Sequence, residues 1–580
     1  MGQGGAASGA QGSEPGADAG QDRRLVVVCH TGNNSCRLGS GGRTVAVDDD
    51  GQGCVMDDRY DVVVIGGGAA GLAGAVALAR ARRSVLVVDA GRPRNAPAGG
   101  VHNHLGREGV PPAELLASGR ADVTGYGGHV VDATVTAVDR DDDGFAVALA
   151  DGRRTRARRL LVATGGVDAL PDVPGLAGRW GRDVLHCPYC HGWEVRDRRV
   201  GVLADGPVGV RQALLWRQWT PHVLLLRHHG DAPDPTQAEQ LAARGVTVVD
   251  GPVTGLVVDD DRLTGVRLAD GGLVRVDALV VATRVAAHAD ALAPLGLFPV
   301  DVDHEGQRVG TRIPADAFGA TDVPGVWVAG NAAAVTATVV VSAAQGVTAA
   351  GAINADLVAE DTARAVEAYR HDLATMFEQD AWEERYRSRP AVWSGNPNPQ
   401  LVAEAADLPP GRALDVGCGE GADAVWLARR GWQVTAVDIA PTAVDRTAAH
   451  AADARVADRV TARQADLRVE APEAGAYQLV SAQFMHLPAG QWRDLVARLA
   501  DAVAPGGTLL VVGHHPLDLR TTARRMHFPE LMFTAEQAAD LLDEARWRVR
   551  VAQARPRAAV DPDGRDVTVH DAVLVAHRLP

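Results

Sequence analysis

The chain has 580 residues, which is too long for one hydrophobic core and indicates three or four domains at roughly 150 residues each. Its hydrophobic fraction of 46% and charged fraction of 23% argue against a mainly disordered, collagenous or membrane-embedded class. The 58 basic and 73 acidic residues give a net charge of −15, which disfavours binding to nucleic acid or to anionic lipid surfaces.

All basic residues other than histidine are arginines, because the sequence contains no lysine. A chain without lysine cannot form the Schiff base of a PLP enzyme or a G-x-x-x-x-G-K-[ST] phosphate loop, so both classes are excluded. The 6 cysteines are too few for a disulfide scaffold, and any close pair is therefore expected to be redox-active or metal-binding.

Residues 1–56 are rich in Gly, Ala, Ser, Gln and Asp and are predicted to form a flexible tail. Their only apolar run, residues 25–29, is shorter than the roughly seven residues that a signal-peptide core needs, so a cytoplasmic location is predicted. Met56 is the hypothetical natural start, because ordered-looking sequence begins one residue later. The long uncharged stretch 328–354 is rich in small and polar residues, which favours a buried helix over a membrane span.

A strand-turn-helix opening typical of nucleotide-binding α/β units recurs at residues 61–80, 199–217 and 412–430. Each opening begins with an aliphatic run, passes through glycines and enters a helix rich in Ala and Leu. The pattern predicts three nucleotide-sized sites. A charged helical stretch, 360–389, and the loop 394–399 separate the second opening from the third, and the main domain boundary is predicted there.

The first opening contains a G-x-G-x-x-G fingerprint between an apolar strand, residues 62–65, and a helix, residues 72–81. Glycines permit the tight turn and let backbone N–H groups approach a pyrophosphate, and an acid at the end of the next strand accepts hydrogen bonds from ribose. The alternative is a glycine-rich turn without a ligand, which this context disfavours. The residues predicted to bind the dinucleotide are Gly66, Gly68, Ala69, Ala70, Gly71 and Asp89.

Two later segments, residues 160–165 and 325–331, resemble the FAD-contacting segments of the flavoproteins that have two dinucleotide domains. The resemblance covers roughly residues 57–356. It implies that FAD contacts are made by Thr164, Gly165, Gly330 and Asn331. Asn331 stands where the family usually carries Asp for the ribityl chain, and an amide can still accept and donate a hydrogen bond there.

The strongest chemical signal is the pair Cys187 and Cys190 in the sequence HCPYCH. Two thiols at this spacing can close a small disulfide, and their lowered pKa values make the thiolates nucleophilic near neutral pH. The spacing is also that of c-type haem attachment, which needs an exported chain, and no export signal is visible. A zinc site would need a second spaced ligand pair, which the sequence lacks. Redox use is therefore favoured.

The pair lies between Thr164-Gly165 of the first FAD segment and the second opening, where the thioredoxin reductase family carries its redox disulfide. That resemblance implies that Cys190 faces the flavin and Cys187 exchanges with substrate. His191 stands where the reductases have an acid, and it is either a proton shuttle for the dithiol or a histidine hydrogen-bonded at a helix start. Residues 187–194 more closely resemble the natural-product dithiol oxidases, flavoenzymes of this fold that form disulfides in small molecules and pass electrons to oxygen.

The second opening has a degenerate fingerprint. Ala204 replaces the first glycine and adds a Cβ at the tightest point, and Pro207 removes an N–H that could face a phosphate. Arg227 follows the next strand and either meets the 2′-phosphate of NADP or is a solvated surface charge. NADP binding is therefore expected to be weak.

The third opening reads D-x-G-x-G-x-G and resembles motif I of the class I SAM-dependent methyltransferases. The resemblance covers about residues 381–580, includes the turn 504–507 before a late strand, and is nearest to small-molecule enzymes of the tellurite-resistance and thiopurine-methylating type. It implies a SAM site whose ribose and adenine are bound by acids and an apolar residue after the motif. The residues assigned to SAM are Asp415, Gly417, Gly419, Gly421, Asp438, Asp466 and Leu467.

Methyl transfer to a thiolate depends more on alignment than on acid-base chemistry. Three histidines, His486, His514 and His515, lie near the expected acceptor side. Each is either an aid to deprotonation or a packing or surface residue. Cys418 is interpreted as a small buried residue of the turn.

These signals predict an α/β protein with two Rossmann-like dinucleotide domains of the thioredoxin reductase type and a C-terminal class I methyltransferase domain. The predicted parts are a tail over 1–56, an FAD domain over 57–170 and 286–358, an NAD(P)-like domain over 171–285, a helical linker over 359–398 and a methyltransferase domain over 399–580.

Two activities are predicted. The first is FAD-dependent dithiol oxidation through Cys187 and Cys190, and the second is SAM-dependent methyl transfer to a sulfur atom of a small molecule. One alternative is an NADPH-dependent thioredoxin reductase with an unrelated methyltransferase tail, and another is a redox-sensing FAD and SAM module without turnover. The expected partners are a small dithiol or disulfide, a thioredoxin-like protein in the reductase alternative, and a second copy of the chain. No metal, nucleic acid or membrane is expected.

Overall fold

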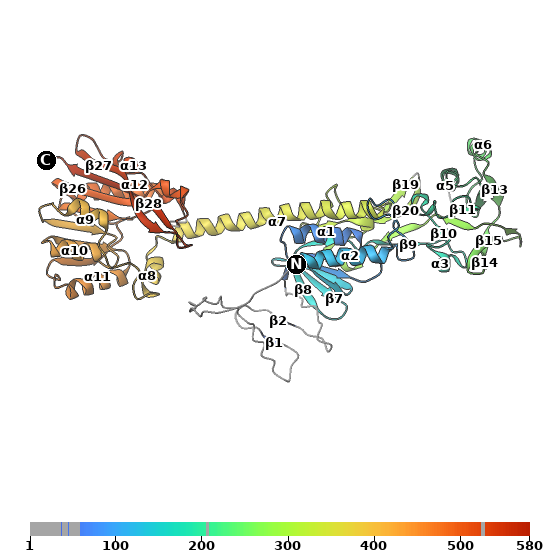
Figure 1. Ribbon diagram of the computed structural model, residues 1–580, viewed down its shortest axis with the longest axis horizontal. Helices are drawn as coiled ribbons and strands as arrows, with labels where there is room; N and C mark the ends of the chain where they lie inside the picture. The colour runs from blue at the N-terminus through green and yellow to red at the C-terminus, as the bar shows by residue number, and fades with distance from the viewer. Residues whose placement is uncertain (1–35, 38–43, 46–58, 205–207, 305, 524–527) are drawn as a thin grey trace, which may run out of the picture. The chain divides into compact units, whose positions relative to one another are not determined.

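The computed structural model describes residues 36–37, 44–45, 59–204, 208–304, 306–523 and 528–580 (Figure 1). It divides into two compact units, Met1–Asp361 and Thr362–Pro580. Apart from the short paired strands β1 (Cys36–Arg37) and β2 (Thr44–Val45), the predictions for the tail 1–56 and for Met56 fall outside the described residues, as does Pro207.

The first dinucleotide domain contains the strands β3 (Arg59–Ile65), β4 (Val85–Asp89), β5 (His129–Asp132), β6 (Val135–Asp141), β7 (Gly144–Leu149), β8 (Arg154–Val162) and β21 (Val326–Val328). They form one sheet in the order β5-β4-β3-β8-β7-β6, with β21 paired to β8. Side chains alternate between faces along a strand. Val62 and Val64 accordingly pack in one core cluster, and Val63 and Ile65 pack in another.

Three helices cover the face of the sheet that carries Val62 and Val64: α1 (Ala69–Arg80), α2 (Pro112–Gly125) and the first half of α7 (Val339–Thr375) (Figure 1). The uncharged stretch 328–354, predicted to form a buried helix, is helical from Val339 onward as the first part of α7. The helix begins at Val339, because residues 330–332 form the short 3-10 helix η2 (Gly330–Ala332) and Gly330 has a φ of +74°. No helix in the described part of the chain is both long and apolar enough to cross a membrane.

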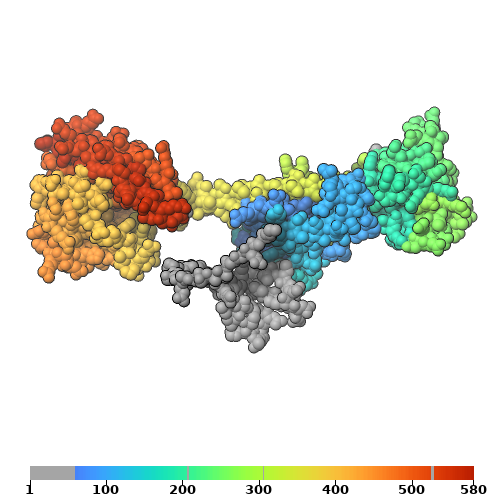
Figure 2. Space-filling view, in the orientation of Figure 1, coloured from blue at the N-terminus to red at the C-terminus, as the bar shows by residue number. Residues whose placement is uncertain are grey.

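The second dinucleotide domain contains the parallel strands β10 (Val184–Leu185), β11 (Val200–Ala204), β12 (Val223–Arg227), β13 (Thr247–Asp250) and β17 (Ala278–Val281), in the order β10-β17-β11-β12-β13. Its other elements are α3 (Leu176–Arg179), α4 (Pro188–His191), α5 (Val208–Trp216), α6 (Pro235–Ala243), β14 (Val253–Asp259), β15 (Arg262–Leu268) and β16 (Leu273–Val274). The two domains adjoin within the first unit, where Figure 2 shows them in blue and green.

The chain leaves the first domain through β9 (Gly166–Ala169) and returns through β18 (Arg284–Ala287), and these two strands pair antiparallel. Next to them lie β19 (Val300–His304) and β20 (Gln307–Arg312), and the 3-10 helix η1 (Asp290–Leu295) packs nearby. This small sheet therefore contains both chain crossings between the two domains of the first unit.

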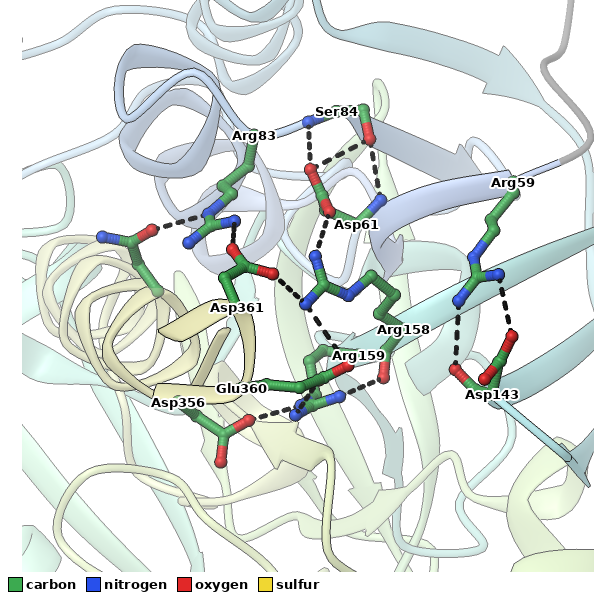
Figure 3. Close-up of polar contacts among 11 residues, drawn as sticks. Arg59, Asp61, Arg83, Ser84, Asp143, Arg158, Arg159, Asp356, Glu360 and Asp361 are labelled. Atoms are coloured by element: carbon green, nitrogen blue, oxygen red, sulfur yellow. Dashed lines mark hydrogen bonds and ion pairs between the residues drawn. The ribbon is translucent and has the colours of Figure 1, made fainter. Parts of the chain in front are cut away.

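An ion-pair cluster anchors α7 to the first domain just before the unit ends (Figure 3). Arg158 lies at its centre, with Nη1 2.9 Å from Asp61 Oδ1 and Nη2 3.3 Å from Glu360 Oε1. Arg83 and Arg159 bind the same helix, at 2.7 Å from Asp361 and 2.6 Å from Glu360. The helix extends past the uncharged stretch because these acids, which interrupt the apolar sequence, find arginine partners on β8 and on the turn after α1.

We expect Arg158→Ala to lower the free energy of unfolding of the first unit by about 2–3 kcal/mol, because it leaves a cluster of carboxylates without its central cation. The side chain of Arg158 is 11% exposed. Arg59 serves as the matched control, since its ion pair with Asp143 is exposed and Arg59→Ala should cost less than about 1 kcal/mol. Denaturant titration of both variants measures the difference, and equal effects would contradict the anchoring role.

The second unit contains the strands β22 (Arg412–Val416), β23 (Gln433–Asp438), β24 (Val460–Gln464), β25 (Tyr477–Gln483), β26 (Val503–His514), β27 (Trp547–Val560) and β28 (Asp566–Arg578). They form one sheet in the order β24-β23-β22-β25-β26-β28-β27, in which β28 runs antiparallel to both neighbours. The helices are α9 (Pro399–Ala405), α10 (Ala422–Arg429), α11 (Pro441–Asp453), α12 (Ala489–Ala502) and α13 (Ala535–Ala539), with the 3-10 turns η3 (Pro516–Arg520) and η4 (Pro529–Leu531).

Most of the predicted linker 359–398 packs as part of the second unit. Its helix α8 (Gln379–Arg387) lies against α11, where the Glu383 carboxylate accepts hydrogen bonds from Thr442 N and Oγ1 at 3.0 and 2.6 Å. Arg446 donates a bond of 2.9 Å to the carbonyl of Tyr386. The division between the units therefore falls at Asp361/Thr362, before the loop 394–399 where the sequence placed the main boundary.

Candidate functional site

The turn between β3 and α1 has a backbone that requires glycine at two positions. Gly66 has a φ of +110°, and a Cβ there would lie 2.3 Å from the carbonyl oxygen of Ala163. A Cβ on Gly71 would lie 1.9 Å from the carbonyl oxygen of Gly66. At Gly68 a Cβ would meet nothing within 4 Å, so the protein leaves open space at the start of the helix. This is the shape that a phosphate group needs in order to approach backbone N–H groups.

Asp89 ends β4 beside this turn and is held as a carboxylate. Burial raises its pKa, but hydrogen bonds from Arg120 at 2.6 Å and from the backbone N–H of Gly91 at 3.1 Å outweigh that effect, and the pKa lies below its ordinary value. An ionised acid in this position is a hydrogen-bond acceptor for ribose hydroxyls.

A cavity of about 1170 Å³ in the first unit joins the predicted FAD residues to the cysteine pair. Its lining includes all of the predicted first-site residues except Gly71, which lies behind the turn. The lining residues among the predictions are Gly66, Gly68, Ala69, Ala70, Asp89, Thr164, Gly165, Gly330, Asn331, Cys187, Cys190 and His191.

The later segments shape the cavity wall by hydrogen bonds. Thr164 Oγ1 donates to the carbonyl of His288 at 2.6 Å, and Gln345 Oε1 accepts from the N–H of Gly330 at 3.0 Å. The amide nitrogen of Asn331 donates to the carbonyls of Ala334 and Ala337 at 3.1 and 3.0 Å. An aspartate could not donate these bonds, so the amide at position 331 closes the turn after η2.

Cys187 and Cys190 form a disulfide at α4, with Cys187 at its N-cap. His186 precedes the pair and stacks on Trp180 with ring centroids 5.4 Å apart. Burial lowers the pKa of His186 to about 4, and nearby Arg94 adds to this effect. Burial also lowers the pKa of His191, against the opposing field of Glu194. Both imidazoles are therefore favoured in the neutral form, which can accept a proton.

The lowered pKa of His186 predicts a pH dependence of stability. In the unfolded chain His186 takes up a proton near pH 6.5, whereas in the folded chain it stays neutral down to about pH 4. Because only the unfolded chain takes up this proton between pH 6.5 and about 4, the free energy of unfolding falls as the pH decreases through this range. Above pH 6.5 the imidazole is neutral in both states and the full stability is present. We expect His186→Asn to flatten the fall in unfolding free energy over this range, measured by denaturant titration at several pH values. An unchanged slope would assign the fall to other groups.

The second nucleotide turn is filled by the side chain that replaces glycine. A Cβ at Gly209 would lie 2.5 Å from the Cβ of Ala204, so the alanine methyl occupies the inside of the turn. Arg227 Nε lies 2.7 Å from Asp250 Oδ1 on the neighbouring strand β13. The cation expected to meet a 2′-phosphate is thus already engaged by a carboxylate.

The glycine loop of the second unit follows β22. Gly417, Gly419 and Gly421 all have positive φ values, of 66°, 55° and 82°. Asp438 at the end of β23 accepts hydrogen bonds from the N–H groups of Gly419 at 2.9 Å and Ala440 at 3.0 Å. The carboxylate thereby holds the loop, and its burial raises the pKa of Asp438.

Asp415 is the most buried acid of this loop, with 2% exposure. Burial, and then the neighbouring Asp423 and Asp438, raise its pKa well above the ordinary value. Within the described residues, its Oδ2 atom has no hydrogen-bond partner. A buried acceptor of this kind beside a glycine loop fits the ammonium group of an amino-acid ligand.

The two residues predicted to flank adenine are engaged in other contacts. Asp466 is ion-paired with Arg468 at 2.9 Å, and this partner lowers the pKa of Asp466. Leu467 belongs to the hydrophobic core. Cys418 is buried, its Sγ lies 3.6 Å from Thr447 Oγ1, and burial raises the pKa of its thiol well above the usual range. This agrees with its interpretation as a small packing residue.

The three histidines of the acceptor side have structural contacts. The ring nitrogens of His486 lie 2.9 Å from the carbonyl of Leu531 and 3.3 Å from the N–H of His514, so both are used by the backbone. His514 stacks on His486, and His515 Nδ1 accepts the N–H of Leu517 at 3.1 Å. These contacts favour the packing interpretation for His486 and His515.

Sequence reasoning missed two aromatic residues over the glycine loop. A Cβ at Gly419 would lie 2.9 Å from Trp393 Nε1 and 3.2 Å from the hydroxyl of Tyr386, and these two atoms are hydrogen-bonded at 3.1 Å. Burial raises the pKa of Tyr386, so it remains a phenol. The signal was present as a cluster of aromatics in a segment interpreted as a linker, in a chain with only 4% aromatic residues.

Comparison with known proteins agrees with this geometry. Residues 60–346 match the family model of pyridine nucleotide-disulphide oxidoreductases, and residues 413–507 match a methyltransferase domain. The crystal structure of HlmI is 45% identical, with a TM-score of 0.51, and the match covers 55% of this chain and 99% of HlmI. The first unit therefore belongs to the pyridine nucleotide-disulphide oxidoreductase family. More particularly, the chain is a thioredoxin-reductase-like enzyme fused to a methyltransferase domain.

Two curated relatives that match the first unit are named as thioredoxin reductases. "Thioredoxin reductase tcpT" of Claviceps purpurea is 40% identical over 154 residues, which are 26% of this chain and 48% of that protein. "Thioredoxin reductase sirT" of Leptosphaeria maculans is 29% identical over 321 residues, which are 52% of this chain and 96% of that protein. The chain thus matches about half the length of the first of these relatives.

Proposed function

We propose that the first unit oxidises a small dithiol to a disulfide through Cys187 and Cys190 with FAD, and that the second unit transfers a methyl group from SAM to sulfur of a small molecule. The observation that carries the first half is the single cavity shared by the glycine turn, Asp89 and the cysteine pair. The observation that carries the second half is the glycine loop with the unsatisfied Asp415 and the loop-holding Asp438.

The residues present fit a flavin dinucleotide. Gly68 leaves open space for a phosphate, and Asp89 is an ionised acceptor for ribose. Thr164, Gly330 and Asn331 line the opposite part of the same cavity. When bound, FAD would supply a two-electron acceptor for the reduced cysteine pair.

The cysteine pair supplies the exchange chemistry. One substrate sulfur attacks Cys187, the bond between Cys187 and Cys190 breaks, and the second substrate sulfur then displaces Cys187, so that the substrate disulfide forms and the protein pair is reduced. Two electrons pass from substrate to the pair, and the substrate loses two protons. His191, favoured in the neutral form, is the base that the geometry offers for one of them.

The residues around the glycine loop of the second unit fit SAM. Asp415 offers a buried acceptor for its ammonium, the glycine loop allows close backbone approach, and Asp438 offers carboxylate oxygens to ribose. A thiolate acceptor needs no dedicated base once it is aligned, which agrees with the packing contacts of His486 and His515.

The alternative of an NADPH-dependent thioredoxin reductase is favoured by the names of the curated relatives. Ala204 in the second turn and the pairing of Arg227 with Asp250 weigh against it. Rapid mixing with NADPH distinguishes the two: flavin reduction at micromolar NADPH would support the reductase, and its absence would support the oxidase. The thioredoxin-like partner, the homodimer and the cytoplasmic location stay predictions.

Anaerobic addition of a dithiol to the purified chain tests the proposal directly. We expect the flavin absorption to bleach, and we expect methyl-labelled SAM to label the same dithiol. If neither half responds to dithiols, the hypothesis that both halves act on the same dithiol is wrong. Binding of FAD and SAM without turnover on any dithiol or methyl acceptor would favour the redox-sensing alternative.

A further inference from the structure

A closed loop beside the cysteine pair carries an imidazole between two carboxylates. Val101 and Val110 pair as an antiparallel bridge that closes this loop, with backbone bonds of 2.8 Å. Inside it, His102 Nδ1 lies 2.6 Å from Glu108 Oε1, and Glu108 Oε2 accepts the N–H of Asn103 at 2.9 Å. The loop therefore fixes the position of Glu108 and presents one ring nitrogen of His102 to it.

The other ring nitrogen faces the cysteine segment. His102 Nε2 lies 3.4 Å from Glu194 Oε1, in the turn that follows α4. Asn103 ties the loop to α4 itself, because its amide nitrogen donates to the carbonyl of Tyr189 at 2.7 Å. The imidazole thus bridges the loop 101–110 and the segment that contains the redox pair.

This bridge runs from the cavity towards solvent. His102 and His191 both line the cavity, and the side chain of His102 is 23% exposed. The side chains of Glu194 and Glu108 are 46% and 67% exposed. A path of titratable groups therefore leads from the dithiol pocket to bulk water.

His191 is coupled electrically to this path. Burial lowers its pKa, Glu194 raises it, and His102 lowers it. His191 also interacts electrostatically with His186, on which Arg94 and Asp168 act as well, and Arg94 Nε donates to Asp168 Oδ2 at 2.6 Å. These are the charged and titratable groups that bear on the proton of His191.

The chemistry of the proposed function creates a need for such a path. Oxidation of a dithiol releases protons in a cavity where His191 is largely buried, and the imidazole must lose its proton before the next turnover. We propose that Glu194, His102 and Glu108 form a proton outlet that carries this proton from His191 to solvent, with the His102 imidazole as the relay between the two carboxylates. Only a proton moves along the outlet; the electron pair stays on the cysteine pair and its acceptor. The inference rests on the proposed dithiol oxidation.

His102→Ala tests the outlet. We expect the turnover of dithiol in the holoenzyme to fall about tenfold, and we expect added imidazole to restore most of it, because a free imidazole can occupy the partly exposed space. His104→Ala is the matched control, since His104 lies on the same loop and its Nδ1 lies 3.4 Å from the carbonyl oxygen of its neighbour Leu105. It should retain full turnover and show no response to imidazole.

A second readout does not require turnover. Alkylation of Cys187 in the reduced protein, followed by mass spectrometry across a pH series, reports the thiolate. Removal of His102 leaves the charge of Glu194 unopposed, which raises the pKa of His191. The imidazolium form of His191 then stabilises the Cys187 thiolate, so the midpoint of Cys187 alkylation should move to lower pH. The same measurement on His104→Ala should show no movement.

The two readouts keep the outcomes separate. Slower turnover that imidazole restores, together with a moved alkylation midpoint, supports the outlet. Slower turnover without rescue and with an unmoved midpoint shows a structural role of the loop and overturns the outlet, as does unchanged turnover. If the unchanged chain oxidises no dithiol, the proposed function fails and takes the outlet with it, whereas a moved midpoint alone would still establish the coupling of His102 to His191.

Discussion

Cys190→Ser is expected to abolish reduction of the bound flavin by dithiols, with a loss of at least about 1,000-fold, because a serine hydroxyl cannot take part in disulfide exchange. The disulfide between Cys187 and Cys190 lines the same cavity as the glycine turn, so no other described thiol can replace it there. Anaerobic stopped-flow absorption at the flavin band measures the rate.

Matched variants sharpen this result. Cys29→Ser removes a thiol from the N-terminal segment and should leave the rate unchanged. Cys187→Ser should also block turnover but should show a long-wavelength absorption band before any reductant is added, because the remaining Cys190 would be a free thiolate against oxidised flavin. If that band appeared in Cys190→Ser instead, the roles of the two cysteines would be exchanged. Full activity in either variant would contradict the assignment of the pair.

Asp438→Ala is expected to weaken SAM binding by about 100-fold or more. The change removes a buried carboxylate that accepts two loop N–H groups, at 2.9 and 3.0 Å, and that we propose accepts the ribose hydroxyls of SAM. Charge-assisted hydrogen bonds contribute about 1.5–3 kcal/mol each, so the loss of two corresponds to roughly two orders of magnitude or more. Isothermal titration of SAM into the full chain measures the dissociation constant.

Asp445 offers the matched control for this variant. It lies on α11, which follows Asp438 directly, and its side chain is exposed. Asp445→Ala should leave SAM binding unchanged, and both variants should retain their flavin, because the first unit has its own core. Equal affinity in Asp438→Ala and the unchanged chain would remove this residue from the site.

The local parts of both sites could be predicted from the sequence because they depend on short-range chemistry. The apolar strand before Gly66 and the positive φ at Gly66 and Gly417 are properties of adjacent residues, and glycine is the residue that meets them. The spacing of Cys187 and Cys190 likewise determines that their sulfurs can meet. The class of each domain followed from such patterns, and the family matches agree with it.

Contacts between distant residues could not be predicted in this way. The sequence does not show that Asn331 donates to the carbonyls of its own turn or that both ring nitrogens of His486 contact backbone groups. It also does not show that Trp393 lies over Gly419. Each of these depends on which side chain the fold brings within about 3 Å, and that choice is made by packing rather than by neighbours in the chain.

The sequence by itself therefore determined the two kinds of nucleotide turn, the redox pair and the degenerate second site, because backbone conformation and thiol spacing are local. Only the tertiary structure decided that α7 runs on to Thr375 and that the segment with Tyr386 belongs to the second unit. It alone placed His102 between Glu108 and Glu194, which lie far apart in the sequence. The reason is that ion pairs and buried hydrogen bonds form only after the chain has folded its distant segments together.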